Sequence, residues 1–541
     1  MNSNKYANKL PYVGYFSVFI IYLLLRIVAW KKTFLFEDHD SVAYLLYIKT
    51  YMQFNLNSII NLSPDHTPFY AIFGALFSLP GWPVEFGARI CSLSFSILLF
   101  ICMIIIAKRI GKPYEIIIGL ILLSFNPVLI PLSFAILTQP SYIATCYLGL
   151  AVFLVQFKKP NLWYGAILGT IFALCFLNRT EGLFYLLIIP FIQVCHFFMC
   201  KQPEYNLKKL VGWTCIFVIF FSIFAIPQIV RVSYKMGRFA INGRQTWALI
   251  INMQEGKSYD EKIYGLNYDT LIPNLWYLQS HQDKDMDYES EFKVNALIKR
   301  ITKNYSELCL GKTGKMLGTL GILFFALGLF AIYQSNFTFE CFVIVAFIVS
   351  SLVASIIAKP AMRYIAIVAP IMTIVAGFGI GFTAQLISNT RLKSKRSIKL
   401  FVVLLCVCAM FVAFTVPLNH IYARQREYNW EYNSNIIRDV ADIVNKIAKD
   451  EQINKIKIIS RKSYLPYFAN AKKVAMPYTD YMTLVSYSSE HEIDFLFLQH
   501  RLIKKYPFLV EFSDSTPPAE FELIYKTIDD YGEKIELYRF K

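Results

Sequence analysis

Long apolar blocks, each bounded by charged residues or prolines, follow one another along the chain as far as residue 417. A helix needs roughly 20 apolar residues to cross the hydrocarbon core of a bilayer. The pattern therefore predicts an α-helical polytopic membrane protein with about 11 transmembrane helices. Their expected bounds are 12–30, 86–107, 114–134, 140–157, 163–177, 182–200, 210–230, 313–333, 338–358, 361–385 and 398–417.

Three hydrophilic regions interrupt or follow these blocks, namely residues 31–85, residues 231–312 and the tail from 418. The tail alternates short apolar runs with helical patterns, which predicts a small α/β domain. We therefore divide the chain into a transmembrane domain, 1–417, and a C-terminal domain, 418–541. The strands of the tail are expected near 455–460, 473–477, 494–498, 521–525 and 534–539.

The charges indicate the orientation. Hydrophobic residues make up 56% of the chain and charged residues only 17%, and the net charge is +17. In a membrane protein such an excess reflects basic cytoplasmic loops and contacts with anionic lipid, so no nucleic-acid partner is expected. Lys31 and Lys32 oppose the trend, but most basic residues share one side if the N-terminus is cytoplasmic. These are Lys5, Lys9, Lys108, Arg109, Lys112, Lys158, Lys159, Lys201, Lys208, Lys209, Arg391, Lys393, Lys395, Arg396 and Lys399.

This orientation places the protein in the cell (plasma or inner) membrane, with the first apolar block retained as a helix rather than cleaved as a signal. The two long hydrophilic loops and the C-terminal domain are then extracytoplasmic. Within the first loop, Phe36-Glu-Asp-His-Asp-Ser-Val-Ala-Tyr44 crowds Glu37, Asp38 and Asp40 at a membrane edge. Such crowding suits a cation, a proton or a polar substrate. A carboxylate here is a candidate general base, and a solvated loop face is the alternative.

Three further polar segments interrupt apolar surroundings. Asp65-His-Thr-Pro-Phe-Tyr70 carries His66, which can also be an ordinary loop histidine. Leu177-Asn-Arg-Thr-Glu-Gly182 carries Arg179 and Glu181, which can simply pair with each other. Ala358-Lys-Pro-Ala-Met-Arg-Tyr364 carries Lys359 and Arg363, for which snorkelling to lipid headgroups is the alternative. An arginine fork is well suited to a lipid phosphate.

All four segments reach the same face of the membrane in the expected topology. Carboxylates and cations meet there, as a lipid-phosphate sugar donor and a nucleophilic acceptor require. The residues resemble those of the C-type membrane glycosyltransferases, the superfamily of protein O-mannosyltransferases and aminoarabinose transferases. The resemblance lies in short motifs and is strongest in the first 200 residues. The motifs there are Asp40-Ser-Val-Ala-Tyr44, His66-Thr-Pro68, Ala88-Arg-Ile90, Asn126-Pro127 and Leu177-Asn-Arg-Thr-Glu-Gly182, and a later one is Arg363-Tyr364. The C-terminal α/β domain is also similar to that of many bacterial and archaeal members.

The resemblance implies an inverting transferase that uses a polyprenyl-phosphate or polyprenyl-diphosphate sugar and a lipid, glycan or protein acceptor. Asp40 would be the base, assisted by Asp38 or Glu37. His66, Tyr44 and Glu181 would contact substrate, with Lys359 beside the two arginines, Arg179 and Arg363, that would neutralise the phosphate.

The chain departs from the family pattern at two places. Gln139 in Thr138-Gln139-Pro140 stands where family members often carry an acidic residue in the second outer loop. The lysine that family members carry after their His-Pro-Pro motif is missing, and Ala71 lies near that position. Because an amide does not bind metal as a carboxylate does, we expect a mechanism without cofactor, although a divalent metal stays an alternative. A lipid-linked sugar transporter (flippase) and a non-catalytic membrane assembly subunit are the rival functions. A transporter would need charges at the bilayer midplane, and an assembly subunit would not need the acidic loop.

Overall fold

The structure is a computed structural model of the whole chain. It describes residues 10–30, 39–156, 161–200, 206–243, 261, 264–267, 272–273, 301–305, 313–335, 338–357, 362–389, 403–406, 408, 434–504, 506–512, 518–528 and 534–541.

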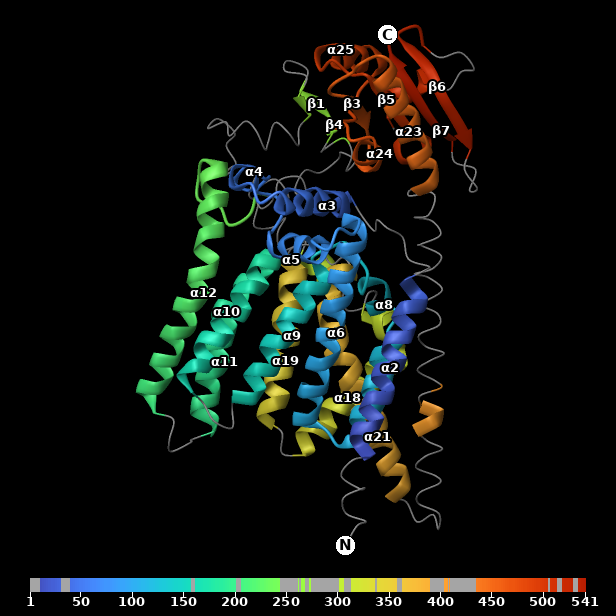
Figure 1. Cartoon of the computed structure of the whole chain (residues 1–541). Helices are drawn as coiled ribbons and strands as arrows, with labels where there is room; N and C mark the ends of the chain where they lie inside the picture. The colour runs from blue at the N-terminus through green and yellow to red at the C-terminus, as the bar shows by residue number, and fades with distance from the viewer. Residues whose placement is uncertain are drawn as a thin grey trace.

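A bundle of apolar helices carries short helices and a small sheet domain at one end (Figure 1). The long helices of the bundle run roughly side by side. The long and short helices of the bundle have the bounds α2 Leu10–Trp30, α6 Val84–Ile110, α7 Pro113–Ser124, α8 Leu129–Leu132, α9 Gln139–Gln156, α10 Leu162–Asn178, η1 Thr180–Phe184, α11 Tyr185–Cys200, α12 Leu207–Met236, α18 Thr313–Gln334, α19 Thr338–Ile357, α20 Met362–Ile365, η3 Ala366–Val368 and α21 Ala369–Asn389.

Six segments of the described residues are long and apolar enough to cross a membrane. They are Pro11–Trp30, Val84–Ile110, Thr180–Met199, Leu207–Met236, Met316–Gln334 and Ala366–Ile387. Shorter apolar helices, including Pro113–Ser124 and Leu162–Asn178, lie among them. The chain is a multi-pass membrane protein, as expected. The expected count of about eleven spans stays a prediction, and most of the last one, 398–417, lies outside the described residues.

One expected span differs from the structure. The sequence predicts a single helix over 114–134, but α7 ends at Ser124 and only the short α8 follows. Asn126 causes this break, because its side-chain oxygen accepts hydrogen bonds from the backbone N–H groups of Val128 and Leu129. Pro127 has no N–H to continue the helix. The irregular backbone is tolerated at this depth because protein surrounds it on all sides.

Two arginines fix the upper end of α2. Arg26 is fully buried, stacks on Tyr22 at 3.6 Å and donates to the backbone oxygen of Ser124 at the end of α7. That helix terminus carries partial negative charge, which suits a guanidinium. Arg89 donates to the backbone oxygen of Trp30 at 2.9 Å and stacks on its ring. Together they set the point at which the chain leaves α2 for the acidic segment.

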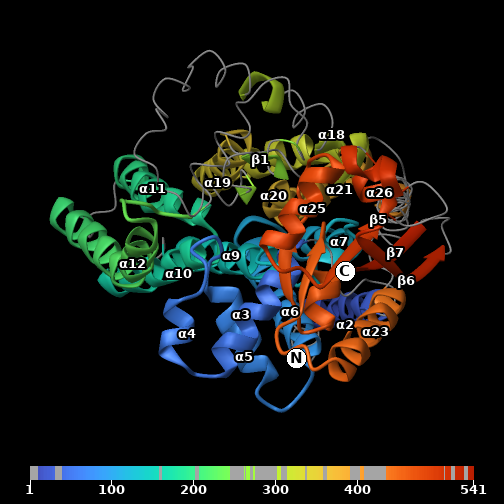
Figure 2. The same cartoon turned by 90° about the horizontal axis from the view of Figure 1, so that it is seen from above.

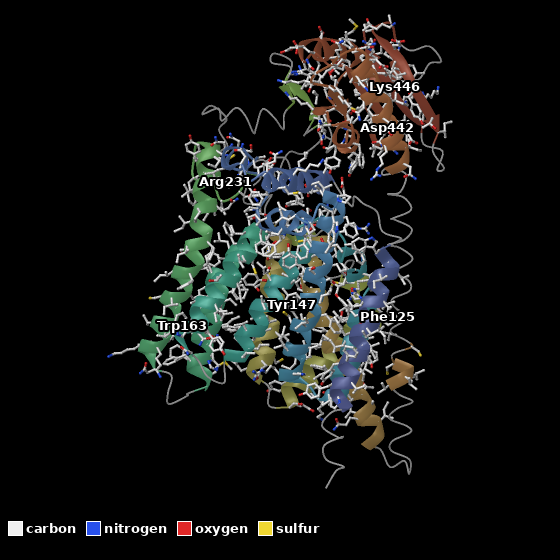
Figure 3. The ribbon with its side chains drawn as sticks, viewed as in Figure 1. Phe125, Tyr147, Trp163, Arg231, Asp442 and Lys446 are labelled. Atoms are coloured by element: carbon white, nitrogen blue, oxygen red, sulfur yellow. The ribbon has the colours of Figure 1, made fainter. Side chains whose placement is uncertain are left out.

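Three short helices lie across the ends of the bundle, on the same side as the sheet domain (Figure 2). Their bounds are α3 His39–Met52, α4 Leu56–Ile60 and α5 Phe69–Ser78. Figure 3 places Arg231, near the end of α12, at this end of the bundle and Trp163 at the other. Arg231 donates to the backbone oxygen of Leu62 at 3.2 Å, which ties α12 to the segment between α4 and α5. We call this side the outer end.

The C-terminal domain contains a five-stranded sheet in the order β4-β3-β5-β7-β6. Strands β4, β3 and β5 are parallel, and β7 runs antiparallel to both β5 and β6. Helices lie between successive strands from β3 to β6, as the tail predicts, and β7 follows β6 in the chain. The bounds are α23 Ser434–Asp450, β3 Lys457–Ser460, α24 Tyr464–Phe468, β4 Lys472–Ala475, α25 Tyr481–Glu490, β5 Phe495–Gln499, α26 His500–Ile503, η4 Pro507–Phe512, β6 Phe521–Ile528 and β7 Lys534–Phe540.

The domain contacts the outer end through α24. The Tyr467 hydroxyl donates to Glu85 at the start of α6 at 2.7 Å, and the ammonium of Lys49 lies 4.2 Å from the Tyr467 ring. A short hairpin of the long second loop, β1 Leu266–Asn267 with β2 Ile272–Pro273, also joins the domain. There the guanidinium of Arg461 donates to the Tyr264 hydroxyl at 2.9 Å. The boundary expected near residue 417 lies outside the described residues.

Candidate active site

Asp40 lies in the first turn of α3 at the outer end of the bundle. The free N–H groups of a helix N-terminus carry partial positive charge, which favours an ionised carboxylate there. The side chain is 20% exposed, so a substrate can reach it although protein surrounds most of it. The helix therefore presents Asp40 as a charged and accessible group.

His66 lies beside Asp40. Its Nε2 atom is 3.5 Å from the Oδ1 atom of Asp40, and its side chain is 10% exposed. The imidazole ring meets Tyr44 and Tyr47 edge-on, with ring centroids 5.1 and 5.4 Å away. Because Tyr44 and Tyr47 follow Asp40 by four and seven positions, all three share one face of α3. The hydroxyl of Tyr47 donates to the backbone oxygen of Ser63 at 2.7 Å, which holds the His66 segment against that face.

A buried network joins this pair to the end of α10. The hydroxyl of Thr67, next to His66, donates to the backbone oxygen of Asn178. The side chain of Asn178 is fully buried and accepts from the hydroxyl of Ser141 in the first turn of α9. The His66 segment, the end of α10 and the start of α9 are thus held together by hydrogen bonds.

Arg179 follows Asn178 directly and has three neighbours. Its guanidinium donates to Glu181 at 2.6 Å and lies 4.6 Å from the Tyr364 ring and 5.8 Å from the Tyr142 ring. Burial alone would lower the pKa of Arg179, but the Glu181 carboxylate outweighs it and raises the pKa above the usual range. Arg179 is therefore a permanent cation, 16% exposed, between an acid and two aromatic rings.

The turn after Arg179 needs a residue without a side chain. A Cβ atom on Gly182 would collide with the backbone of Phe176 and Cys175 in the last turn of α10. The contact lets η1 fold back against α10 and places Glu181 beside Arg179. Asn242, in the segment after α12, comes within hydrogen-bond distance of Thr180, its side-chain nitrogen 3.4 Å from the hydroxyl. The second long loop therefore begins against this site.

The structure brings Asp40, His66 and Tyr44 together, and it brings Arg179 to Glu181. The Thr67–Asn178 hydrogen bond makes the two groups neighbours. Glu37, Asp38 and Lys359 lie outside the described residues. Arg363 is in α20, but its side chain also lies outside the described part; its neighbour Tyr364 contacts Arg179.

Sequence reasoning missed Tyr47, Asn178 and Tyr142 as parts of this site. Tyr47 carries a signal, since it lies seven positions after Asp40 on a short helix. Asn178 is a polar residue that ends an apolar span, which is the position of a helix terminus. Tyr142 is part of an apolar block, and nothing in its pattern separates it from a core residue.

The residues described at the outer end supply Asp40 and His66 as metal ligands but no third. Among the described residues no three His, Cys, Asp or Glu side chains lie close enough to hold an ion. Gln139, at the start of α9, is 3% exposed and its side-chain oxygen has no hydrogen-bond partner in the described part of the chain. An amide oxygen is a weaker metal ligand than a carboxylate. The described side chains do not fit a metal centre.

Comparison by sequence with protein-family models and with curated proteins gives no match. Comparison of the fold with solved structures does. Archaeal oligosaccharyltransferase AglB from Archaeoglobus fulgidus, in complex with an inhibitory peptide and a dolichol-phosphate, superposes with a TM-score of 0.60. It is 12% identical, and the match covers 98% of this chain and 74% of AglB.

ArnT from Cupriavidus metallidurans, bound to undecaprenyl phosphate, gives a TM-score of 0.56 at 11% identity. That match covers 96% of this chain and 97% of ArnT. Both neighbours are C-type membrane glycosyltransferases, the class that the short motifs of this sequence resemble. From its first transmembrane helix to its C-terminal sheet, this chain has the fold of the C-type membrane glycosyltransferases.

Proposed function

We propose that the protein transfers a glycosyl group from a polyprenyl-phosphate or polyprenyl-diphosphate carrier to a lipid, glycan or protein acceptor at the extracytoplasmic face of the membrane. One observation carries this proposal. In a fold shared with enzymes solved with dolichol-phosphate and undecaprenyl phosphate, a carboxylate–histidine pair and a half-buried arginine are neighbours at one end of the bundle.

In the proposed reaction Asp40 is the general base, assisted by Asp38 or Glu37. The acceptor O–H or N–H gives its proton to the Asp40 carboxylate while its oxygen or nitrogen bonds to the anomeric carbon. The bond from that carbon to the carrier phosphate breaks, and the phosphate leaves with the electron pair. One displacement of this kind inverts the anomeric configuration. His66, 3.5 Å from Asp40, orients the carboxylate, and Tyr44 orients His66.

The leaving phosphate gains negative charge as the bond breaks, so a cation placed beside it stabilises the transition state. We assign this role to Arg179 together with Arg363 and Lys359. Tyr364 supports the assignment, because its ring lies against Arg179 and its backbone neighbour is Arg363. Glu181 occupies one N–H group of Arg179 and leaves others for phosphate oxygens.

The proposed direction of the site follows from the basic residues. Lys108 and Arg109 lie in the last turn of α6 and Lys112 follows it, and Lys208 and Lys209 lie in the first turn of α12 at the same side. All five lie at the end of the bundle opposite Asp40. The positive-inside rule then makes the outer end extracytoplasmic. The division of the chain near residue 417 belongs to the same proposal.

We propose that the transfer needs no cofactor. One solved form of the neighbour AglB is a complex with zinc and sulfate, so a divalent metal is the alternative. Glu37 and Asp38 are the residues through which such an ion could reach Asp40. Transfer measured after chelation and after addition of Mg²⁺, Mn²⁺ or Zn²⁺ distinguishes the two.

The test is turnover of purified protein in lipid nanodiscs with radiolabelled undecaprenyl-phosphate sugars and a mixed acceptor extract. We expect Asp40→Asn to lose about 10²–10⁴-fold in rate, as is typical for loss of a positioned general base. Donor binding should stay near the wild-type value, because it rests on the cations. The anomeric configuration of the product, read by NMR, should be inverted relative to the donor.

Near-wild-type turnover of Asp40→Asn would remove Asp40 from this role and move it to Asp38 or Glu37. An intact donor and no glycosylated product would favour the transporter or the assembly subunit instead. Asp65→Asn is the matched control. Its carboxylate lies in the same outer region but accepts from the nearby Ser63 hydroxyl at 2.9 Å.

A further inference from the structure

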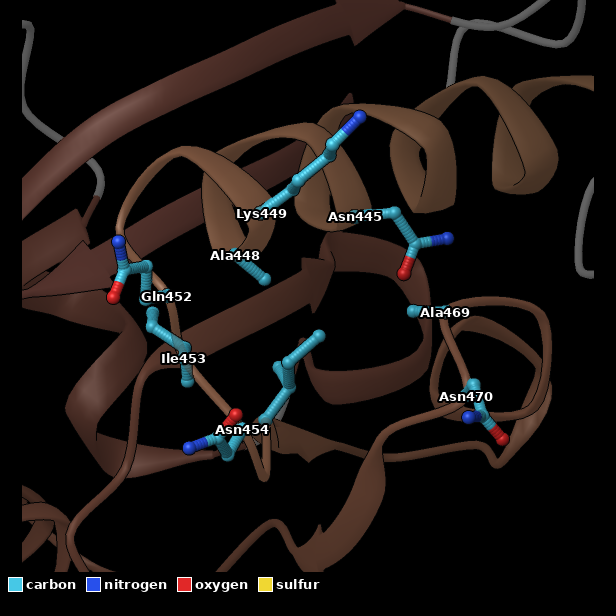
Figure 4. Close-up of a pocket in the computed structure, with 9 residues that line it drawn as sticks. Asn445, Ala448, Lys449, Gln452, Ile453, Asn454, Ala469 and Asn470 are labelled. Carbon is cyan, nitrogen blue, oxygen red and sulfur yellow. The ribbon is translucent and has the colours of Figure 1, made fainter.

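An open cleft of about 520 Å³ lies on the C-terminal domain (Figure 4). Three pieces of chain line it: the last turns of α23, the turn that leads into β3, and the turn between α24 and β4. Its volume is within the range of small-ligand sites in proteins. No step of the proposed transfer uses these residues.

The cleft has an apolar floor and an amide rim. Ala448, Ile453, Ile456 and Ala469 form the floor and are buried or half-buried, whereas four amides surround it: Asn445, Gln452, Asn454 and Asn470. In the described part of the chain none of these four side chains forms a hydrogen bond or an ion pair with protein. Figure 4 shows the ammonium of Lys449 directed away from the floor. None of the described carboxylates lines the cleft.

Two of the rim amides occupy unusual backbone positions. Gln452 and Asn470 have φ values of 58° and 49°, in the left-handed region. Each follows a helix end of the Schellman type, shown by the hydrogen bonds from Ile453 to Ala448 and from Ala471 to Pro466, both 2.8 Å. Glycine is the usual residue at this position, because a Cβ atom costs free energy there. The chain carries an amide at both positions instead.

The two helix ends also set the charge of the cleft. The last carbonyl groups of α23 and α24 carry partial negative charge, which disfavours an anionic ligand. Each amide offers one acceptor and two donors, and carbonyl groups add further acceptors. Sugar hydroxyls are donors and acceptors at once, so they match such a rim without any charge.

We propose that this cleft binds an uncharged saccharide chain. The site is separate from the outer-end site and is tested without reference to transfer. Full-length protein in detergent is applied to immobilised tetrasaccharides of neutral hexoses and N-acetylhexosamines. Sialylated or sulfated tetrasaccharides and uncharged hexapeptides are presented in parallel, and affinities are then measured in solution for every ligand that is retained.

We expect binding to the neutral saccharides. The variant Gln452→Gly/Asn470→Gly should lower that affinity about 10-fold or more, since two hydrogen-bonding side chains are lost. Its thermal unfolding temperature should stay equal or rise, because glycine relieves both left-handed residues. If Gln452 and Asn470 had a purely structural role, the double variant would keep its saccharide affinity and its thermal unfolding temperature would fall. Asn445→Ala/Asn454→Ala removes the other two amides at ordinary backbone positions and should also lower the affinity.

Glu492→Gly is the matched control, because Glu492 has φ 50° at the helix end of α25 on the same domain but does not line the cleft. It should leave saccharide binding unchanged. Retention of only the acidic saccharides or the peptides would overturn the proposal. So would no retention at all, or unchanged affinity in both double variants.

Discussion

Two roles compete for the guanidinium of Arg179: a local ion pair and a contact with the carrier phosphate. The structure contains the ion pair with Glu181 and adds the aromatic face of Tyr364. These neighbours do not exclude a phosphate contact, because a guanidinium has five N–H donors and Glu181 accepts from one of its nitrogens. The two roles differ in what a lysine at this position would do.

We expect Arg179→Lys to weaken donor use about 10- to 100-fold, because an ammonium keeps the charge but loses the planar fork. The measurement is turnover against undecaprenyl-phosphate sugar concentration. Glu181→Gln serves as the control: it frees the guanidinium, so donor use should stay equal or improve. If Arg179 and Arg363 hold one phosphate, Arg179→Lys/Arg363→Lys should deviate from additivity. Wild-type donor use by Arg179→Lys would leave the ion pair as its sole role.

Lys473 gives a residue-scale prediction for stability. Burial, together with the neighbouring cations Arg461 and Lys462, lowers the pKa of Lys473 from 10.5 to about 7. Between pH 7 and 10.5 the unfolded chain binds a proton at this site that the folded chain does not, so stability rises with pH across that window. We expect the protection factors of the β3 and β4 amides, the ratio of intrinsic to observed exchange rate, to rise with pH accordingly. In Lys473→Met this pH dependence should become weaker; an unchanged dependence would contradict the prediction.

At the scale of elements, the lengths of the apolar blocks predicted the helix bundle, and local side-chain hydrogen bonds and proline interrupted one of its helices. The alternation in the tail predicted the strands β3 to β7 because each strand buries one or both faces in a small domain. The break after α7 was missed, since Asn126 and Pro127 lie within an otherwise continuous apolar block. The edge-on packing of His66 between Tyr44 and Tyr47 also could not be predicted, because it depends on how α3 lies against the segment before α5.

The turn from α10 into η1 is the element on which the geometry of Arg179 depends. We expect Gly182→Ala to displace η1, since a methyl group would meet the backbone of Phe176 and Cys175. Transfer should fall at least 10-fold, with a loss of about 1–3 kcal/mol in stability, as for other overpacked sites. Activity and thermal unfolding in nanodiscs check this. Gly81→Ala, where the added Cβ meets nothing within 4 Å, is the control for a glycine change, although its φ of 85° will cost some stability.

At the scale of the whole molecule, the sheet domain and the candidate site share one end of the bundle. The Tyr467–Glu85 hydrogen bond and the Arg461–Tyr264 contact attach the domain to α6 and to the second long loop. In the proposed transfer, an acceptor would therefore reach Asp40 at the end of the bundle that carries the domain. The sheet domain, the second long loop and the candidate site must then all lie on one side of the membrane.

The topology is tested by reporter fusions. Fusions after Lys159 and after Arg396 should score cytoplasmic, and fusions at Gln282 and at Lys541 external, because the basic residues of α6 and α12 lie at the end opposite the sheet domain. Lys31 and Lys32 oppose this orientation but are outnumbered. Changing both to Ser should leave the reporter pattern unchanged. A cytoplasmic reporter at Lys541 would place Asp40 and Arg179 in the cytoplasm, and the proposed transfer at the outer face would fail with it.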